Sequence, residues 1–357
     1  MSIATVRKYR FETGVYRPPS EGGSCSLLLR VTRNCPWNKC GFCSMYKGKK
    51  FAIRPVEEVK GDINAIAAVC ADLRKISTEL GQGGDLSRDA VLELIRREPS
   101  LNFTLSFGMV LDWLRSGGRT AFLQDANTPI MKTAGLVEIL RYLKKTFPSL
   151  TRITSYARSK TLARKSLEEL TAIREAGLDR VHVGLETGDA ALLKRVKKGS
   201  SPEDHIKGGR KAMSAGFQLS EYWMPGLGGK AGWKAHATET ARVLNEINPH
   251  YIRSRPFFPH PGTPLFDMYQ DKSMELLTSR GQLVELRLMI EKLEVTSKVC
   301  FDHAGNHWTG RSGRTLLSHG YEGYAFPDEK TRVLDLIDEG IEVQKASPQD
   351  PPAWLLR

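Results

Sequence analysis

Strand and helix signals alternate along most of this chain of 357 residues, and the alternation limits the possible folds more than any other feature. Short apolar runs are separated by stretches with apolar residues at helical spacing. The expected strands cover residues 26–32, 119–124, 151–156, 180–185, 217–224 and 250–255. The expected helices cover residues 55–80, 134–146, 166–177, 201–216 and 231–247. Six such units predict an α/β fold with parallel strands, an incomplete (βα)6 barrel.

Three cysteines, Cys35, Cys40 and Cys43, fall within nine residues directly after the first expected strand. They lie in the sequence Asn34-Cys-Pro-Trp-Asn-Lys-Cys-Gly-Phe-Cys-Ser44. Three thiolates can bind three irons of a [4Fe–4S] cluster and leave the fourth iron open. An open iron can bind a small molecule and pass an electron to it. The spacing therefore predicts a cluster of this kind.

The same three cysteines also fit simpler roles. Free cysteines pack well as small buried side chains, and a zinc site would need a fourth ligand. Cys25 would lie at the opposite end of the strand, roughly 25–30 Å from Cys35 at about 3.3 Å per residue. Six cysteines are few for a disulfide framework, and Cys70 and Cys300 are isolated, so we expect core thiols and no second cluster.

Composition places the chain among ordinary globular proteins, with 40% apolar and 26% charged residues. No apolar run is long enough to span a membrane. Residues 1–10 are polar and basic and lack the apolar core of a secretory leader, so we expect a reducing, cytoplasmic setting. The net charge of +13 favours an anionic partner such as a nucleic acid, a phosphorylated metabolite or an acidic lipid.

The expected organisation has four parts. Residues 1–24 form an N-terminal extension, and residues 25–265 form the barrel. Residues 266–346 form a helical or mixed extension, and residues 347–357 form a proline-containing tail. Residues 81–118 are too long for a simple connection and are interpreted as an insertion, with short helices at 87–97 and 107–115. The insertion could be a lid, a substrate element or a decoration.

Three motifs give the chain a family resemblance. They are Arg17-Pro-Pro-Ser-Glu21, the cysteine motif followed by Met45-Tyr46-Lys47, and Gly184-Leu-Glu-Thr-Gly188 with Lys198-Gly199 after it. Over residues 17–310 the chain resembles the radical SAM superfamily. It resembles the branch that contains oxygen-independent coproporphyrinogen oxidase, the Elongator catalytic subunit and methylthiotransferases, and within it a family of mostly uncharacterised Fe–S oxidoreductases. Its Cys-x4-Cys-x2-Cys spacing has one residue more than the usual Cys-x3-Cys-x2-Cys, which still permits three ligands.

The resemblance implies two cofactors, a [4Fe–4S] cluster and S-adenosylmethionine (SAM), and an external one-electron donor such as flavodoxin or ferredoxin. SAM would bind the open iron and be cleaved reductively to a 5′-deoxyadenosyl radical that abstracts hydrogen from substrate. Such an enzyme would be an oxygen-sensitive oxidoreductase or transferase.

Several residues match family positions that contact SAM. Phe42 resembles the residue beside the adenine, and Glu186 resembles the residue that binds the ribose hydroxyls. Lys198 resembles the cation that pairs with the methionyl carboxylate. Asp125, with Asn127 in the same turn, stands where the family often has a Gly-Gly-Glu that receives the amino group. Core packing, a surface carboxylate, a solvated lysine and a turn aspartate are the respective alternatives.

The fifth and sixth strands and the segment beyond them supply further candidates. The resemblance places Ser220, Glu221, Gly226 and Gly228 near SAM. Candidates for contact with substrate are Tyr222, His303, Asn306 and His307. Arg253 and Arg255 could bind an anionic substrate or pair with acidic neighbours.

Three functions follow from these observations. The first is a radical SAM enzyme acting on an unidentified small molecule or lipid, with an anion favoured by the charge. The second is a radical SAM enzyme that modifies tRNA, which only the basic charge supports. The third is a non-catalytic carrier of haem or of a cluster.

Overall fold

The computed structural model describes residues 8–14 and 26–345. The motif at residues 17–21, Cys25 and the predicted tail at residues 347–357 lie outside them. The described residues group into two compact units. The first takes in residues 8–14, 26–34, 50–156 and 171–180, and the second residues 35–49, 157–170 and 181–345. The predicted boundaries at residues 24, 265 and 346 stay predictions.

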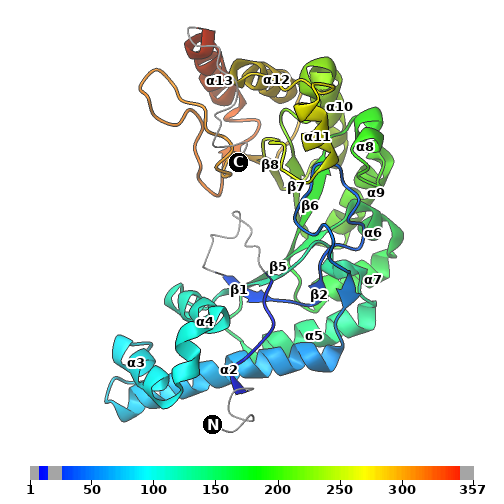
Figure 1. Cartoon of the computed structure of the whole chain (residues 1–357). Helices are drawn as coiled ribbons and strands as arrows, with labels where there is room; N and C mark the ends of the chain where they lie inside the picture. The colour runs from blue at the N-terminus through cyan, green and yellow to red at the C-terminus, as the bar shows by residue number, and fades with distance from the viewer. Residues whose placement is uncertain (1–7, 15–25, 346–357) are drawn as a thin grey trace. The chain divides into compact units, whose positions relative to one another are not determined.

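The first unit contains three of the six predicted strands: β1 (Ser26–Leu29), β4 (Thr120–Leu123) and β5 (Arg152–Ala157), the last of which ends in the second unit. They are neighbours in that order and run parallel, with Leu27 opposite Ala121 and Phe122 opposite Thr154. The helices α2 (Val56–Glu79) and α5 (Thr133–Thr146) pack side by side, as Figure 1 shows. Their apolar faces, which include Ile63 and Leu140, are fully buried. These elements confirm the sequence prediction.

The predicted insertion at residues 81–118 belongs to the first unit. It forms α3 (Arg88–Arg97), a 3₁₀ turn (Pro99–Phe103) and α4 (Leu105–Arg115), close to the expected helices. α4 packs on β1 and α2, and its Trp113 is buried edge-on against Phe147 at 5.3 Å. The insertion therefore contributes to the core of this unit.

The second unit contains the other three predicted strands, β6 (Arg180–Glu186), β7 (Gln218–Trp223) and β8 (Tyr251–Ser254). Two strands that the sequence did not predict, β9 (Lys298–Cys300) and β10 (Tyr324–Ala325), follow them in the sheet. β7, β8 and β9 run parallel, and β10 pairs antiparallel with β9. The strand order along the chain is that of the predicted (βα)6 arrangement, which confirms a parallel α/β fold.

Helices separate and follow these strands. They are α6 (Ser159–Arg164), α7 (Leu167–Glu175), α8 (Ala190–Arg195), α9 (Pro202–Ser214), α10 (Gly229–Ile247), α11 (Pro264–Gln270), α12 (Ser279–Glu291) and α13 (Lys330–Lys345). α9 begins with a reciprocal capping box between Ser201 and Asp204. Ser166 and Glu169 exchange the same kind of capping bonds at the start of α7, at 3.0 and 3.1 Å. None of the described helices combines the length and the apolar character that a bilayer crossing requires.

The C-terminal extension supports the turn after β7. Gly226, at φ +86°, donates its backbone N–H to the carboxylate of Glu285 in α12. Glu285 is fully buried, and its Oε1 has no hydrogen-bond partner among the described residues. Burial raises the pKa of Glu285 to about 8, and the bond from Gly226 opposes that rise.

This burial predicts a pH dependence of stability. Because the pKa of Glu285 is about 8 in the folded chain and near 4.5 otherwise, the folded state binds more protons between these values. Its contribution to the free energy of unfolding therefore falls as pH rises through that window, by at most about 1.4 kcal/mol per pH unit. Glu285→Gln keeps an acceptor for Gly226 and removes the titration.

Chemical denaturation of both proteins from pH 5 to 8.5 measures the effect. We expect the free energy of unfolding of the wild type to decrease relative to that of Glu285→Gln as pH rises. Other titrating groups, including buried Glu221, are present in both proteins, so their effects cancel in the difference between the two free energies of unfolding. A difference that stays constant with pH would contradict the assignment.

Candidate functional site

The three cysteines lie in one loop of the second unit, residues 35–49, and all three are half-buried free thiols. Asn38 takes the left-handed backbone conformation at φ +49° and donates its N–H to Cys35 Sγ at 3.3 Å. Burial raises the pKa of Cys40, and the charges of Lys198 and Arg158 oppose that rise. In the described part of the chain, no three His, Cys, Asp or Glu side chains converge as on a single metal ion. A [4Fe–4S] cluster instead takes its thiolates on separate irons.

The loop is bonded to the segment that follows α8. Gly41 donates its N–H to Val196 O at 2.8 Å, and Trp37 Nε1 donates to Lys197 O at 2.6 Å. Gly199, at φ +74°, lies under the Trp37 ring, where a Cβ would come within 2.4 Å of the ring. Only glycine fits this contact. The glycine of the predicted Lys198-Gly199 pair thus lets the chain approach the cysteine loop.

Two residues predicted to bind SAM form a partly buried ion pair in this unit. Lys198 Nζ lies 2.6 Å from Glu186 Oε1, and both side chains are about 14% exposed or less. Glu186 ends β6 at φ +63° and reaches back over Gly184, where a Cβ would collide with its carboxylate at 2.1 Å. Burial lowers the pKa of Lys198, but Glu186 and Cys40 more than offset this, so the pKa is raised and the ammonium stays charged.

Phe42, in the cysteine loop, lies next to the ion pair of Lys198 and Glu186. Lys198 Nζ lies 5.8 Å from the centroid of its ring. The ring also packs against a buried apolar cluster that includes Leu192, Val196 and Leu265. Phe42 therefore has both the packing role that the sequence left open and a place beside the ion pair.

Sequence reasoning missed Arg158 and Trp37. Arg158 Nη2 donates to Lys198 O at 2.7 Å, and its guanidinium lies 5.1 Å from the Trp37 ring. Arg158 lies directly after β5, and no local pattern signals its contact with a segment 40 residues away. Together Arg158 and Lys198 place two positive charges near the thiols.

On β7, Ser220 and Glu221 are both fully buried. Neither the Ser220 hydroxyl nor either Glu221 carboxylate oxygen has a hydrogen-bond partner among the described residues. Burial raises the pKa of Glu221 well above its usual value, opposed by the charge of Lys198. As neighbours on a strand, the two side chains point to opposite faces of the sheet. They therefore cannot both contact SAM from one face.

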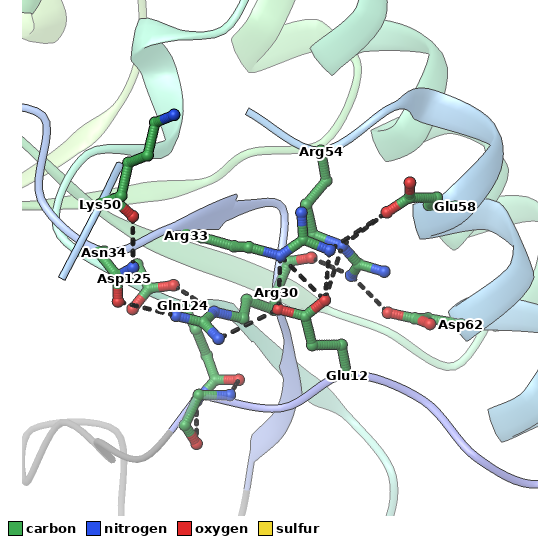
Figure 2. A network of polar contacts seen from close by, with 11 residues as sticks. Glu12, Arg30, Arg33, Asn34, Lys50, Arg54, Glu58, Asp62, Gln124 and Asp125 are labelled. Atoms are coloured by element: carbon green, nitrogen blue, oxygen red, sulfur yellow. Dashed lines mark hydrogen bonds and ion pairs between the residues drawn. The ribbon is translucent and has the colours of Figure 1, made fainter. Parts of the chain in front are cut away.

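Asp125 and Asn127 lie in the first unit. Asp125, at φ +70°, accepts a bond from Arg30 Nε at 2.6 Å, and Gln124 exchanges two hydrogen bonds with Gly14, as Figure 2 shows. Asn127 is buried and precedes a 3₁₀ turn (Thr128–Ile130). Asp125 thus takes the turn conformation that was the alternative to ligand binding. A role toward the SAM amino group stays a prediction.

The two glycines after β7 have structural roles. Gly226 takes a positive φ, and a Cβ on Gly228 would come within 3.1 Å of His236 in α10. Their predicted approach to SAM stays a prediction.

The candidates for substrate contact lie in two places. Tyr222 on β7 is opposite Arg253 on β8 and lies edge-on to His182 on β6, with ring centroids 5.4 Å apart. His303, Asn306 and His307 follow β9 in the extension.

Asn306 bonds this segment to β8, and each histidine has one ring nitrogen in contact with the backbone of its own loop. Asn306 exchanges hydrogen bonds with Ser254 at 2.7 and 3.1 Å. His303 Nδ1 accepts from Gly305 N at 3.0 Å, and His307 Nδ1 contacts Gly305 O at 2.9 Å. Burial, with a smaller effect of Arg255, lowers the pKa of His303 to about 4.

Arg253 is fully buried beside two aromatic rings. Its guanidinium lies 5.0 Å from the Tyr251 ring and 4.6 Å from the Tyr321 ring. Nη1 is 2.9 Å from Asp302, which is the acidic pairing that the sequence left open. Nε and Nη2 have no hydrogen-bond partner among the described residues. These two atoms form the edge that can bind a carboxylate or phosphate with two hydrogen bonds.

The residues of the second unit fit the two implied cofactors. Three thiols in one loop, with positive side chains near them, suit an anionic thiolate cluster. A buried ammonium, a buried carboxylate and an aromatic ring suit the carboxylate, the ribose and the adenine of SAM. Buried polar atoms without partners, such as those of Glu221, are what a polar ligand would satisfy.

Comparisons with known proteins agree with this interpretation. Residues 29–230, more than half of the chain, match the model of the Radical SAM superfamily. The chain is 30% identical to biotin synthase of Desulforudis audaxviator (strain MP104C) over 155 residues, 43% of each protein, so the match spans less than half of that relative.

Solved structures with similar folds include methylornithine synthase (18% identity, TM-score 0.44, covering 79% of this chain and 67% of that one). Coproporphyrinogen III oxidase from Escherichia coli is similar over 74% of this chain and 51% of its own (14% identity, TM-score 0.45). The family match decides the assignment: the chain belongs to the radical SAM superfamily, whose enzymes use a [4Fe–4S] cluster and S-adenosylmethionine.

Proposed function

We propose that Cys35, Cys40 and Cys43 bind the [4Fe–4S] cluster and that Lys198, Glu186 and Phe42 bind SAM beside it. The observation that carries the proposal is the partly buried pair of Lys198 and Glu186, 2.6 Å apart, with Lys198 5.8 Å from the Phe42 ring inside the cysteine loop. Phe42 is far from Glu186 and Lys198 in the sequence, and all three belong to the same unit. Thiolates that must stay reduced suit a cytoplasmic enzyme.

The side chains divide the recognition of SAM between them. The Lys198 ammonium has three N–H donors, of which Glu186 Oε1 takes one, so others are free to bind the methionyl carboxylate. Glu186 keeps acceptor capacity for ribose hydroxyls. Phe42 offers a ring face to the adenine, and burial of the pair excludes water that would weaken these contacts.

When bound, the cofactors supply one-electron reductive cleavage of the C5′–S bond of SAM, giving methionine and a 5′-deoxyadenosyl radical that removes a hydrogen atom from substrate. The electron comes from an external donor such as flavodoxin or ferredoxin. The chain's own part is to orient both cofactors and to keep water away.

Removal of the cysteines tests the cluster. We expect Cys35→Ala, Cys40→Ala and Cys43→Ala, singly or combined, to abolish iron and sulfide uptake on anaerobic reconstitution, because each thiolate holds a separate iron. The variants should form no 5′-deoxyadenosine from SAM and dithionite.

Cys70→Ala is the matched control, because Cys70 is a half-buried thiol in α2, outside the loop. Iron content, absorbance near 400 nm and chromatography of the nucleoside are the measurements. Iron uptake by the triple variant equal to that of Cys70→Ala would refute the proposal.

Lys198→Met tests the SAM site. Loss of a charged hydrogen bond costs roughly 1.5–3 kcal/mol, so SAM should bind about 10- to 100-fold more weakly, with cluster content unchanged. Lys194→Met removes an exposed lysine of α8 and should leave the affinity as it is. Anaerobic equilibrium dialysis with the reconstituted proteins measures both. Equal SAM affinity in the two variants would exclude Lys198 from the site.

We infer further that the substrate carries a carboxylate or phosphate, supported by the Nε and Nη2 edge of Arg253. Phosphate or acetate should then raise the melting temperature of the wild type more than chloride does at equal ionic strength. Arg253→Lys keeps the charge and loses the paired donors, so this selective rise should disappear. An equal anion effect in both proteins would contradict the inference.

A further inference from the structure

The base of the cysteine loop is a short hairpin in the first unit. β2 (Thr32–Arg33) and β3 (Ala52–Ile53) pair antiparallel, with Arg33 opposite Ala52. Asn34, at φ +64°, donates from its side chain to Lys50 O at 2.6 Å. Residues 34 and 50 flank the loop, so these contacts close it. A pairing of only two residues on each side is weak by itself and needs support.

Three arginines lie in this hairpin or next to it in the sequence: Arg30, Arg33 and Arg54. A single carboxylate, that of Glu12, touches all of them, at 3.1, 2.6 and 3.3 Å respectively. Figure 2 shows Glu12 pointing into the group of guanidinium ends. With Arg33 the contact is bidentate, since Nε and Nη2 both donate to the carboxylate. Arg33 belongs to β2 and Arg54 follows β3, so Glu12 joins both sides of the hairpin.

The other acids of the group do not replace Glu12. Asp125 pairs with Arg30, and Asp62 pairs with Arg54. Glu58 contacts Arg33 and Arg54 at 3.2 and 3.6 Å, but its side chain is 49% exposed and its contacts are the longer ones. Of the acids in residues 8–14 and 26–345, Glu12 is the one in ion-pair contact with all three arginines. Arg54 is 4% exposed, so loss of a partner there is costly.

Glu12 reaches this place on a segment, residues 8–14, that is held on either side of it. Tyr9 donates its hydroxyl to Asp72 Oδ2 at 2.7 Å. Gly14 donates to Gln124 Oε1 at 2.7 Å and accepts from Gln124 Nε2 at 3.1 Å. The segment is therefore a strap bonded to α2 and to the end of β4.

We propose that Glu12 is a positioning residue that closes the base of the cysteine loop, so that the N-terminal strap controls how firmly the three thiols are held. The part concerning the cluster rests on the proposed function, while closure of the hairpin does not. Without Glu12 the guanidiniums of Arg33 and Arg54 share only the longer contacts with the more exposed Glu58, and the two-residue ladder opens. The thiols then sit on a longer, looser loop.

Glu12→Gln tests this, because it keeps the shape and removes the charge. Glu57→Gln is the control: Glu57 is 81% exposed and lies in a surface pair with Lys60 on the same unit. Glu12→Asp is the conservative variant. Tyr9→Phe removes one of the two bonds from the strap to Asp72, since Lys8 Nζ also lies 2.6 Å from Asp72 Oδ2. It weakens the strap without touching the arginines, and it guards against failure of Glu12→Gln to fold.

Two readouts separate the outcomes. In the apo protein, trypsin should cut at exposed Lys49 and Lys50 faster in Glu12→Gln than in the control, and faster in Tyr9→Phe to a smaller degree. In the reconstituted protein, a chelator should remove iron roughly tenfold faster from Glu12→Gln, as expected for loss of a charged contact. Glu12→Asp should restore most of both values, which a general packing defect would not allow.

Cleavage and iron-release rates in Glu12→Gln equal to those of Glu57→Gln would overturn the inference while leaving the proposed function intact. If the wild type takes up no cluster, the proposed function fails, and the trypsin comparison still decides the role of Glu12. Faster cleavage in Glu12→Gln that Glu12→Asp does not restore would also count against a charge-based role.

Discussion

The partly buried ion pair between Lys198 and Glu186 is the interaction on which the site depends. It joins the end of β6 to the segment after α8, and that segment holds the cysteine loop through Val196 and Lys197. A buried pair of charges is costly to form, and a hydrophobic pair of similar size is often as stable. The proposed binding of SAM would account for a pair of charges at this place, beside three thiols and an aromatic ring.

Charge is arranged around the cysteine loop in two ways. In the second unit, Lys198 and Arg158 place positive charge near the thiols, which suits an anionic cluster and an electron acceptor. In the first unit, Arg30, Arg33 and Arg54 lie at the loop's base, where carboxylates neutralise them. The second set stabilises the chain at the base of the loop. Part of the excess of basic residues thus has local uses within the chain.

The sequence predicted the fold where the signal was local and periodic. All six expected strands and all five expected helices were found, because a buried strand or an amphipathic helix repeats its pattern over many residues. The six-residue helices α6 and α8 and the two-residue strands β2 and β3 are too short to show a period. β9 and β10 were missed because three and two residues of strand depend on their neighbours in the sheet.

Local motifs also identified some residues of the candidate site, but they could not show its long-range contacts. Motif resemblance singled out Phe42, Glu186 and Lys198, which lie together, but no pattern could show that Glu186 and Lys198 pair. Trp37, Arg158 and Glu12 act through contacts 18 to 160 residues away along the chain, and such contacts leave no local trace. Asp125 shows the opposite case: a residue that looked like a ligand is bonded to Arg30, a partner 95 residues away.

The most direct test of the account is low-temperature electron paramagnetic resonance of the anaerobically reconstituted, dithionite-reduced protein, recorded with and without SAM. The account predicts the signal of a reduced [4Fe–4S] cluster whose g values change when SAM is added, because SAM binds at the iron that the three cysteines leave open. A cluster signal that SAM does not alter, or no cluster signal at all, would contradict it.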